Sequence, residues 1–80
     1  MLRVDGHTDR VPLGPNAPFE SNWELSTARS LSVIAYFESR GVPPRRLLAA
    51  GFGEHYPIAE GRTQEAYARN RRIELKLTSR

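Results

Sequence analysis

Cysteine and long apolar runs are both absent from this chain of 80 residues. Without cysteine, the chain forms neither a disulfide framework nor a thiolate metal site. No apolar stretch approaches the roughly 20 residues that a membrane-spanning helix needs. A chain this short folds as one small domain with a thin core, because small domains bury a smaller fraction of their surface.

Lysine is nearly absent as well, since Lys76 is the one basic residue of 12 that is not an arginine. The formal net charge is +3 and the sequence pI is about 10.0. Arginine is suited to planar, two-pronged contacts with anions. The composition therefore leaves carboxylate, phosphate and nucleic-acid partners open.

Three segments have the composition of β-strands. In residues 2–9, apolar and polar residues alternate, as in a strand with one buried face that ends near Asp9. Residues 46–53 form a short, mostly apolar segment, and residues 72–77 alternate again. A loop rich in proline, residues 10–20, follows the first of these strands.

Two helices are predicted between the strands. Ser21 opens a capping-box pattern, so the first helix is expected over residues 22–40, where Gly41 offers a left-handed stop. Thr63 caps a second, short helix that ends at about Asn70. The order strand, helix, strand, helix, strand predicts an α+β domain in which two helices cover one face of a small mixed β-sheet.

The position of Arg29 in the first helix is unusual. Steps of four along a helix place it in one stripe with Leu25, Val33 and Phe37, so we expect its guanidinium to be partly desolvated. Breaking a buried pair of this kind costs about 3 to 5 kcal/mol, so such an arginine needs an anion. Two interpretations stay open: an internal salt bridge, with Asp9 as the partner, or a pocket where both residues also contact a ligand.

Four sequence blocks together resemble the peptidoglycan-binding domain of OmpA-like proteins. The blocks are VDGHTD, NWELSTARS, GFGEHYPI and ARNRRIEL, and they span nearly the whole chain in this order. The SNWELS form and the loop before it are most similar to flagellar stator members of the family. The resemblance implies a non-catalytic domain of the periplasm that anchors a motor or outer-membrane protein to the cell wall. In that family the domain holds the diaminopimelate of the stem peptide without a covalent bond.

The same resemblance implies the residues of the site. An aspartate takes the ligand's ammonium, an arginine of the first helix takes its carboxylate, and an arginine before the last strand adds a further contact. The predicted ligand-binding set is Asp9, Asn22, Leu25, Arg29, Asn70 and Arg71. No cofactor is implied.

The family domain normally begins with another strand and helix before VDGHTD. We therefore expect residues 1–80 to be a shortened domain that lacks this first strand and helix, with any membrane anchor in a segment outside this chain. The loss should uncover apolar surface around Leu31 and Ile34, so we expect either a homodimer or higher assembly, or else a marginally stable monomer.

The two histidines are the candidates for catalysis and for metal binding. His7, Asp9 and the distant His55 provide too few ligands for a metal site of ordinary composition. His7, Asp9 and Ser26 lack the sequence pattern of a hydrolytic triad. We therefore predict no catalytic residue and no metal ligand.

Two other classes of function stay open on the residues alone. An arginine-rich nucleic-acid-binding module would use phosphate contacts, although the aromatic residues do not interleave with the arginines as stacking platforms would. Its candidate residues are Arg45, Arg46, Arg69, Arg71 and Arg72. A purely structural dimerisation module would use a second apolar strip of the first helix, formed by Ala28, Leu31, Ile34 and Ala35.

Overall fold

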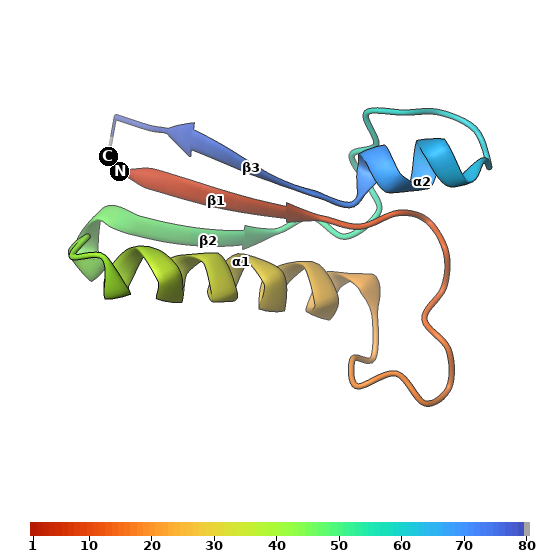
Figure 1. Cartoon of the computed structure of the whole chain (residues 1–80), viewed down its shortest axis with the longest axis horizontal. Helices are drawn as coiled ribbons and strands as arrows, with labels where there is room; N and C mark the ends of the chain where they lie inside the picture. The colour runs from red at the N-terminus through yellow and green to blue at the C-terminus, as the bar shows by residue number, and fades with distance from the viewer. Residues whose placement is uncertain (80) are drawn as a thin grey trace.

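The computed structural model describes residues 1–79, which form a three-stranded mixed sheet with two helices (Figure 1). Strand β1 (Leu2–His7) lies at the centre of the sheet. It is parallel to β2 (Leu47–Gly51) and antiparallel to β3 (Arg72–Leu77). The predicted α+β class and the order of the elements are thereby confirmed, although β1 ends two residues before Asp9.

The helices begin and end at the predicted signals. Helix α1 (Asn22–Ser39) starts where Ser21 Oγ accepts the N–H of Glu24 at 3.2 Å. Just beyond its end, Gly41 adopts a φ of 96°, the left-handed conformation that favours glycine. The caps were therefore readable from local sequence.

The remaining helical segments are short. Helix α2 (Gln64–Asn70) is capped by Thr63, whose Oγ1 accepts the N–H of Ala66 at 3.1 Å. A 3₁₀ turn, η1 (Pro44–Arg46), leads into β2. In Figure 1, α2 lies beyond the end of the sheet where β1 ends, whereas α1 runs along the face of the sheet.

Helix α1 packs against β1 and β2 through small residues. A Cβ atom placed on Gly6 would lie 2.2 Å from the carbonyl oxygen of Ser26, and one on Gly51 would lie 2.1 Å from Thr27 Oγ1. Ser26 and Ser30 are fully buried, and Ser30 Oγ donates to the carbonyl oxygen of Ala50 at 2.7 Å. The helix can approach the sheet this closely only because both strands present glycine there.

This packing corrects the prediction for Arg29. Its side chain is exposed, because the buried stripe of α1 is Asn22, Ser26 and Ser30 rather than the stripe of bulky residues. The gap between helix and sheet is too narrow for large side chains. Leu25 and Phe37 are accordingly only half-buried beside that gap.

Both faces of β1 are covered, whereas the alternating pattern predicted one exposed face. Val4 and Asp5 are fully buried, although they point to opposite faces, and His7 is 4% exposed. The segment that follows β2 covers the second face, where the ring of Phe52 stacks on His7 with 5.1 Å between centroids. Burial lowers the pKa of His7, and the positive charge of Arg72 adds to this effect.

The first residue and the end of β3 lie side by side (Figure 1). The Met1 amino group donates to the carbonyl oxygen of Thr78 at 3.0 Å, and the Thr78 N–H donates to the carbonyl oxygen of Met1 at 2.8 Å. Neither helix in residues 1–79 is long and apolar enough to cross a membrane.

Candidate functional site

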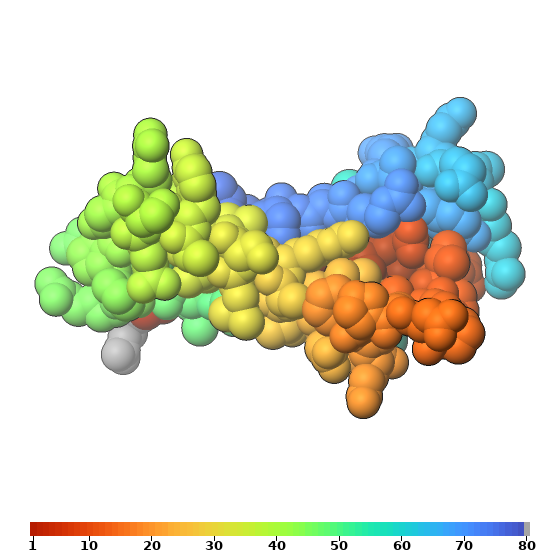
Figure 2. All heavy atoms as spheres, turned by 60° about the horizontal axis from the view of Figure 1, so that its bottom comes forward, coloured from red at the N-terminus to blue at the C-terminus, as the bar shows by residue number. Residues whose placement is uncertain are grey.

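A pocket of about 270 Å³ lies where the loop after β1 meets the start of α1. Figure 2 shows this loop in orange at the same end of the molecule as α2, in blue. Five of the six predicted site residues line the pocket. The full lining is Thr8, Asp9, Val11, Pro12, Leu13, Gly14, Asn22, Leu25, Arg29 and Arg71.

Asp9 is the acidic group of the pocket, and its partner is Arg71 rather than Arg29. Asp9 Oδ2 accepts a hydrogen bond from Arg71 Nη1 at 2.7 Å, and Oδ1 accepts the N–H of Val11 at 3.0 Å. The Asp9 side chain is 13% exposed and that of Arg71 is 42% exposed. The carboxylate is therefore held in place from two sides while one edge still meets solvent.

Arg29 is the uncommitted cation of the pocket. Its side chain forms no hydrogen bond and no ion pair with any residue from 1 to 79. The internal salt bridge to Asp9 that the sequence left open is not formed. The guanidinium of Arg29 is consequently available to an anion from outside.

Asn22 fastens the loop to the helix. Its Nδ2 donates to the carbonyl oxygens of Val11 at 3.2 Å and Asp9 at 3.4 Å, and lies 3.3 Å from Glu54 Oε1. The residue is 8% exposed, so most of its amide faces protein. Asn22 thus shapes the wall of the pocket by holding the backbone on either side of Arg10.

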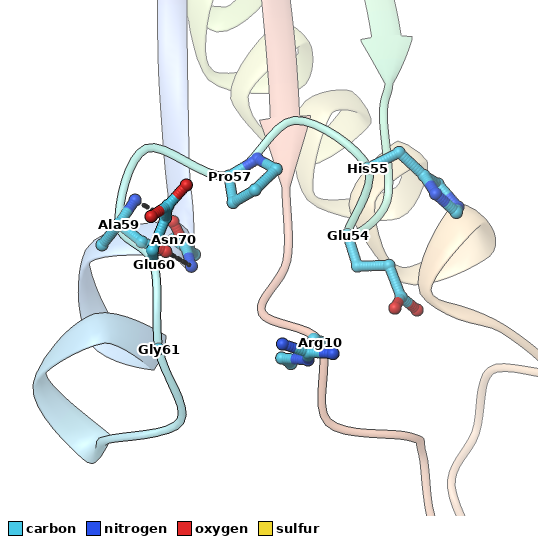
Figure 3. Close-up of a pocket in the computed structure, with 8 residues that line it drawn as sticks. All are labelled: Arg10, Glu54, His55, Pro57, Ala59, Glu60, Gly61 and Asn70. Carbon is cyan, nitrogen blue, oxygen red and sulfur yellow. Dashed lines mark hydrogen bonds between the residues drawn. The ribbon is translucent and has the colours of Figure 1, made fainter.

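Asn70 is placed elsewhere by the structure. It lines a second pocket of about 430 Å³, where it sits against the loop that carries Ala59 (Figure 3). Its Oδ1 accepts the N–H groups of Ile58 and Ala59 at 2.8 and 3.0 Å, and its Nδ2 donates to the carbonyl oxygen of Ala59 at 3.0 Å. With its amide engaged in this way and 5% of the residue exposed, Asn70 orders a loop.

The loop residues of the first pocket were not predicted from the sequence. Val11, Pro12 and Leu13 form an apolar wall, because the loop folds back over the first turn of α1. Loop conformation is not encoded in a periodic pattern. The one residue that could have indicated the position of the loop is Asn22. A buried amide at the start of a helix needs hydrogen-bond partners, and the nearest carbonyl groups are those of the preceding loop.

The pocket combines one carboxylate, one free guanidinium and an apolar wall. A carboxylate binds an ammonium group, and a guanidinium binds a carboxylate in a two-pronged contact. The arrangement therefore suits a zwitterionic ligand end with a short aliphatic chain.

The fold is shared with solved structures of other proteins. The chain is similar to the C-terminal domain of Helicobacter pylori MotB, with a TM-score of 0.91 and 30% identity over 99% of this chain and 59% of that one. The cell wall anchor of the T6SS from Pseudomonas aeruginosa is also similar, with a TM-score of 0.83 and 34% identity over 92% of this chain and 51% of that one.

Sequence relatives extend the same group. The peptidoglycan-associated lipoprotein of Pseudomonas aeruginosa is 34% identical over 73 residues, which are 91% of this chain and 40% of that protein. The chain spans about a third of the length of the first curated relatives it matches. The family model described as "OmpA family" matches residues 1–71, and on this match the chain belongs to the OmpA family.

Proposed function

We propose that this chain binds peptidoglycan non-covalently, by holding the diaminopimelate of a stem peptide in the pocket around Asp9 and Arg29. The domain would thereby anchor an envelope or flagellar motor protein to the cell wall from the periplasm. The observation that carries the proposal is the uncommitted guanidinium of Arg29 in the same pocket as the carboxylate of Asp9.

The chemistry of the ligand end matches the pocket. Diaminopimelate presents an ammonium and a carboxylate on one carbon, which Asp9 and Arg29 would bind respectively. Leu25 and the loop wall would contact its methylene groups. Charge-assisted hydrogen bonds contribute about 1.5 to 3 kcal/mol each, and exposure of the arginine reduces this value. We therefore expect weak to moderate affinity for a single stem peptide.

Asp9 keeps its role while it is paired with Arg71. A carboxylate has about four lone-pair sites, and the hydrogen bonds from Arg71 and Val11 use two of them. The remaining sites can accept an ammonium. In this arrangement Arg71 orients the carboxylate, and its own exposed part adds positive charge beside the ligand.

The names of the relatives support an anchoring role. One is a cell wall anchor, one is a peptidoglycan-associated lipoprotein and one is a motility protein, MotB. Because the chain spans only part of each relative, the protein that this domain would anchor is part of the proposal.

Sedimentation with purified cell-wall sacculi tests the function. We expect the wild-type chain to sediment with sacculi, and the Arg29→Ala and Asp9→Asn variants to remain mostly in solution. Arg45→Ala is the matched control, because Arg45 is exposed in η1, away from the pocket. A wild-type chain that stays in solution, or an Arg45→Ala variant that loses as much binding as Arg29→Ala, would contradict the proposal.

The arrangement of the arginines counts against a nucleic-acid interface. Arg45 and Arg46 precede β2 at one end of the sheet, whereas Arg69 and Arg71 lie at or next to α2 at the other end (Figure 1). Arg71 is paired with Asp9, and Arg72 donates to Glu74. These five arginines therefore do not form one continuous basic face. A mobility-shift assay over a range of salt concentrations should show no discrete complex with DNA or RNA.

A further inference from the structure

A second cluster of chemical groups lies on the face of the sheet that α1 does not cover. Gly6 faces α1, so the alternate residues Arg3, Asp5 and His7 point to the opposite face. The register of β1 with β3 sets Arg3 across from Lys76, Asp5 across from Glu74, and His7 across from Arg72. Two carboxylates thus stand directly opposite each other, and the positive charges of Arg3, Arg72 and Lys76 offset the repulsion between them.

His7 is buried here without hydrogen-bond partners. The residue is 4% exposed, and neither Nδ1 nor Nε2 forms a hydrogen bond with any of residues 1–79. Its Nε2 lies 4.0 Å from Glu74 Oε1, so the ring edge points toward the carboxylates. A buried imidazole nitrogen normally has a partner, and this one faces a site where a ligand would supply it.

The carboxylates are already oriented by arginines. Asp5 Oδ1 and Oδ2 accept hydrogen bonds from Arg3 at 2.8 and 2.9 Å. Glu74 Oε2 accepts one from Arg72, which leaves Glu74 Oε1 turned toward His7. Hydrogen bonds of this kind from outside a metal site fix the orientation of its ligating carboxylates.

Lys76 supplies a third cation beside the two carboxylates, farther from them than Arg3 and Arg72. Its Nζ lies 3.8 Å from Asp5 Oδ2 and 3.6 Å from Glu74 Oε1, distances that are too long for hydrogen bonds. The side chain is 50% exposed and extends from an edge strand, so it can turn outward into solvent. A smaller cation with a higher charge could then sit between the carboxylates.

We propose that Asp5, His7 and Glu74 form a binding site for a divalent transition-metal ion, with Zn²⁺ as the best match, and that the ion displaces the ammonium of Lys76. One ligand atom from each residue can be chosen so that all three lie within 4.8 Å of one another. One imidazole with two carboxylates suits Zn²⁺, whereas Mg²⁺ and Ca²⁺ prefer oxygen ligands alone. A groove of about 520 Å³ beside the cluster, lined in part by Tyr56 and Ile58, leaves room for a water molecule as the fourth ligand.

The ion would join the central strand to an edge strand. Asp5 and His7 belong to β1 and Glu74 belongs to β3. A ligand that binds only the folded state stabilises it, so an ion at this position would hold β3 in place in a domain with a thin core. This site was not predicted from the sequence, because Glu74 comes close to His7 only through the pairing of strands that are distant in sequence. His55, which the sequence analysis considered as a second histidine ligand, stacks on Trp23 instead.

Calorimetric titration of the chelator-treated chain with Zn²⁺ and with Mg²⁺ tests the site. We expect one Zn²⁺ ion to bind per chain, no saturable binding of Mg²⁺, and a melting temperature that rises with Zn²⁺. His7→Gln and Glu74→Gln should each weaken Zn²⁺ binding about tenfold or more. Glu74 lies on an edge strand and is 31% exposed at its side chain, so its variant tests the site even if His7→Gln fails to fold.

Two further variants make the test specific. Lys76→Gln should bind Zn²⁺ more tightly than wild type, because it removes the competing ammonium. His55→Gln is the matched control and should bind as wild type does. The proposal is overturned if neither wild type nor Lys76→Gln binds Zn²⁺, if Lys76→Gln binds more weakly than wild type, or if His55→Gln loses binding while His7→Gln keeps it.

Discussion

The exposure of Arg29 differs between the sequence-based prediction and the structure, and this difference affects how strongly Arg29 can select a ligand that carries a carboxylate. The sequence predicted a partly desolvated guanidinium, but the side chain is exposed. An exposed arginine gains less from a carboxylate than a buried one, because solvent screens the pair. It also remains ready to bind without first breaking an internal contact.

The first prediction concerns ligand choice at Arg29. A stem peptide with lysine at the diaminopimelate position lacks the carboxylate that Arg29 is proposed to hold. We expect wild type to prefer the diaminopimelate peptide by about tenfold, near the low end for a charge-assisted contact, because the arginine is exposed. Arg29→Ala should lose this preference, and Arg29→Lys should not restore it fully, since an ammonium lacks the two-pronged geometry. Calorimetric titration with both muropeptides measures this, and equal affinities for wild type would remove Arg29 from the site.

The second prediction concerns His7 and pH, in the presence of a chelator. Burial lowers the pKa of His7 in the folded state, while Arg72 and Lys76 add to the shift and Glu74 and Asp5 oppose it. The folded state therefore binds this proton less readily than the unfolded state, whose pKa is near 6.5. The free energy of unfolding should be highest above that value and fall as the pH drops below it toward the folded pKa.

Urea unfolding between pH 8 and pH 5 measures this slope. His7→Gln removes the titrating group, so its stability should change less over the same interval, whatever its absolute value. Equal slopes for the two chains would mean that His7 carries no linked proton. The hydrogen bond from Arg72 lowers the pKa of Glu74 in the folded state. The stability that the ionised Glu74 contributes to the domain is therefore lost only at more acidic pH, as the pH falls through that lowered pKa.

At the scale of elements, the contact between α1 and the sheet depends on glycines at two strand positions. The third prediction is that Gly6→Ala destabilises the domain strongly, because its Cβ would lie 2.2 Å from the backbone oxygen of Ser26, which cannot turn away. Overpacking of this kind typically costs about 1 to 3 kcal/mol, and backbone contacts belong to the upper part of that range. Gly14→Ala is the matched control, since a Cβ there meets nothing within 4 Å. Urea denaturation should separate the two variants clearly, and similar midpoints would contradict this account of the packing.

How well each structural feature could be predicted depends on how far apart in sequence the residues that determine it lie. The helix starts at Ser21 and Thr63 and the stop at Gly41 were predicted because capping is local. The burial of Ser26 and Ser30 was not, since it depends on glycines in strands that lie 20 or more residues away. Small residues repeating every fourth position of the helix, with glycine in two predicted strands, were the signal that would have indicated a close approach.

At the scale of the whole molecule, the OmpA-like family predicted from the sequence is confirmed. The prediction of a non-enzymatic domain agrees with membership of this family. The candidate pocket was predicted in large part because its charged residues carry the family pattern. Its apolar wall was not, because the loop of residues 11–14 has no such pattern. Asn70 was predicted to line the same pocket as Arg71. The two residues are adjacent in sequence, but they line different pockets.

The fourth prediction concerns self-association. Strand β3 is an edge of the sheet, and it exposes 53% of Leu75 and 87% of Leu77. Leu31 on α1, where the sequence placed the uncovered surface, is 54% exposed. Because an apolar edge strand is a template for pairing with another chain, we expect a concentration-dependent dimer through β3.

Sedimentation equilibrium over a wide range of concentrations measures this dimer. Leu77→Lys should weaken it if β3 forms the contact, and Leu31→Lys should leave it unchanged. The reverse result would assign the contact to α1. A single monomeric species at every concentration would contradict the prediction.

The position of Met1 next to β1 has a mechanical consequence for the anchoring role proposed above. Met1 directly precedes β1, and Asp9, which lines the pocket, follows the other end of the strand by two residues. A pulling force between a tether at Met1 and a ligand in the pocket would run along the axis of β1. Because Met1 and Asp9 lie at the two ends of the same continuous stretch of chain, the load on Asp9 would pass along the covalent backbone of β1, and the hydrogen bonds to β2 and β3 would not have to break. The covalent chain would carry the tension, so the domain would resist unfolding when it is pulled at these two points.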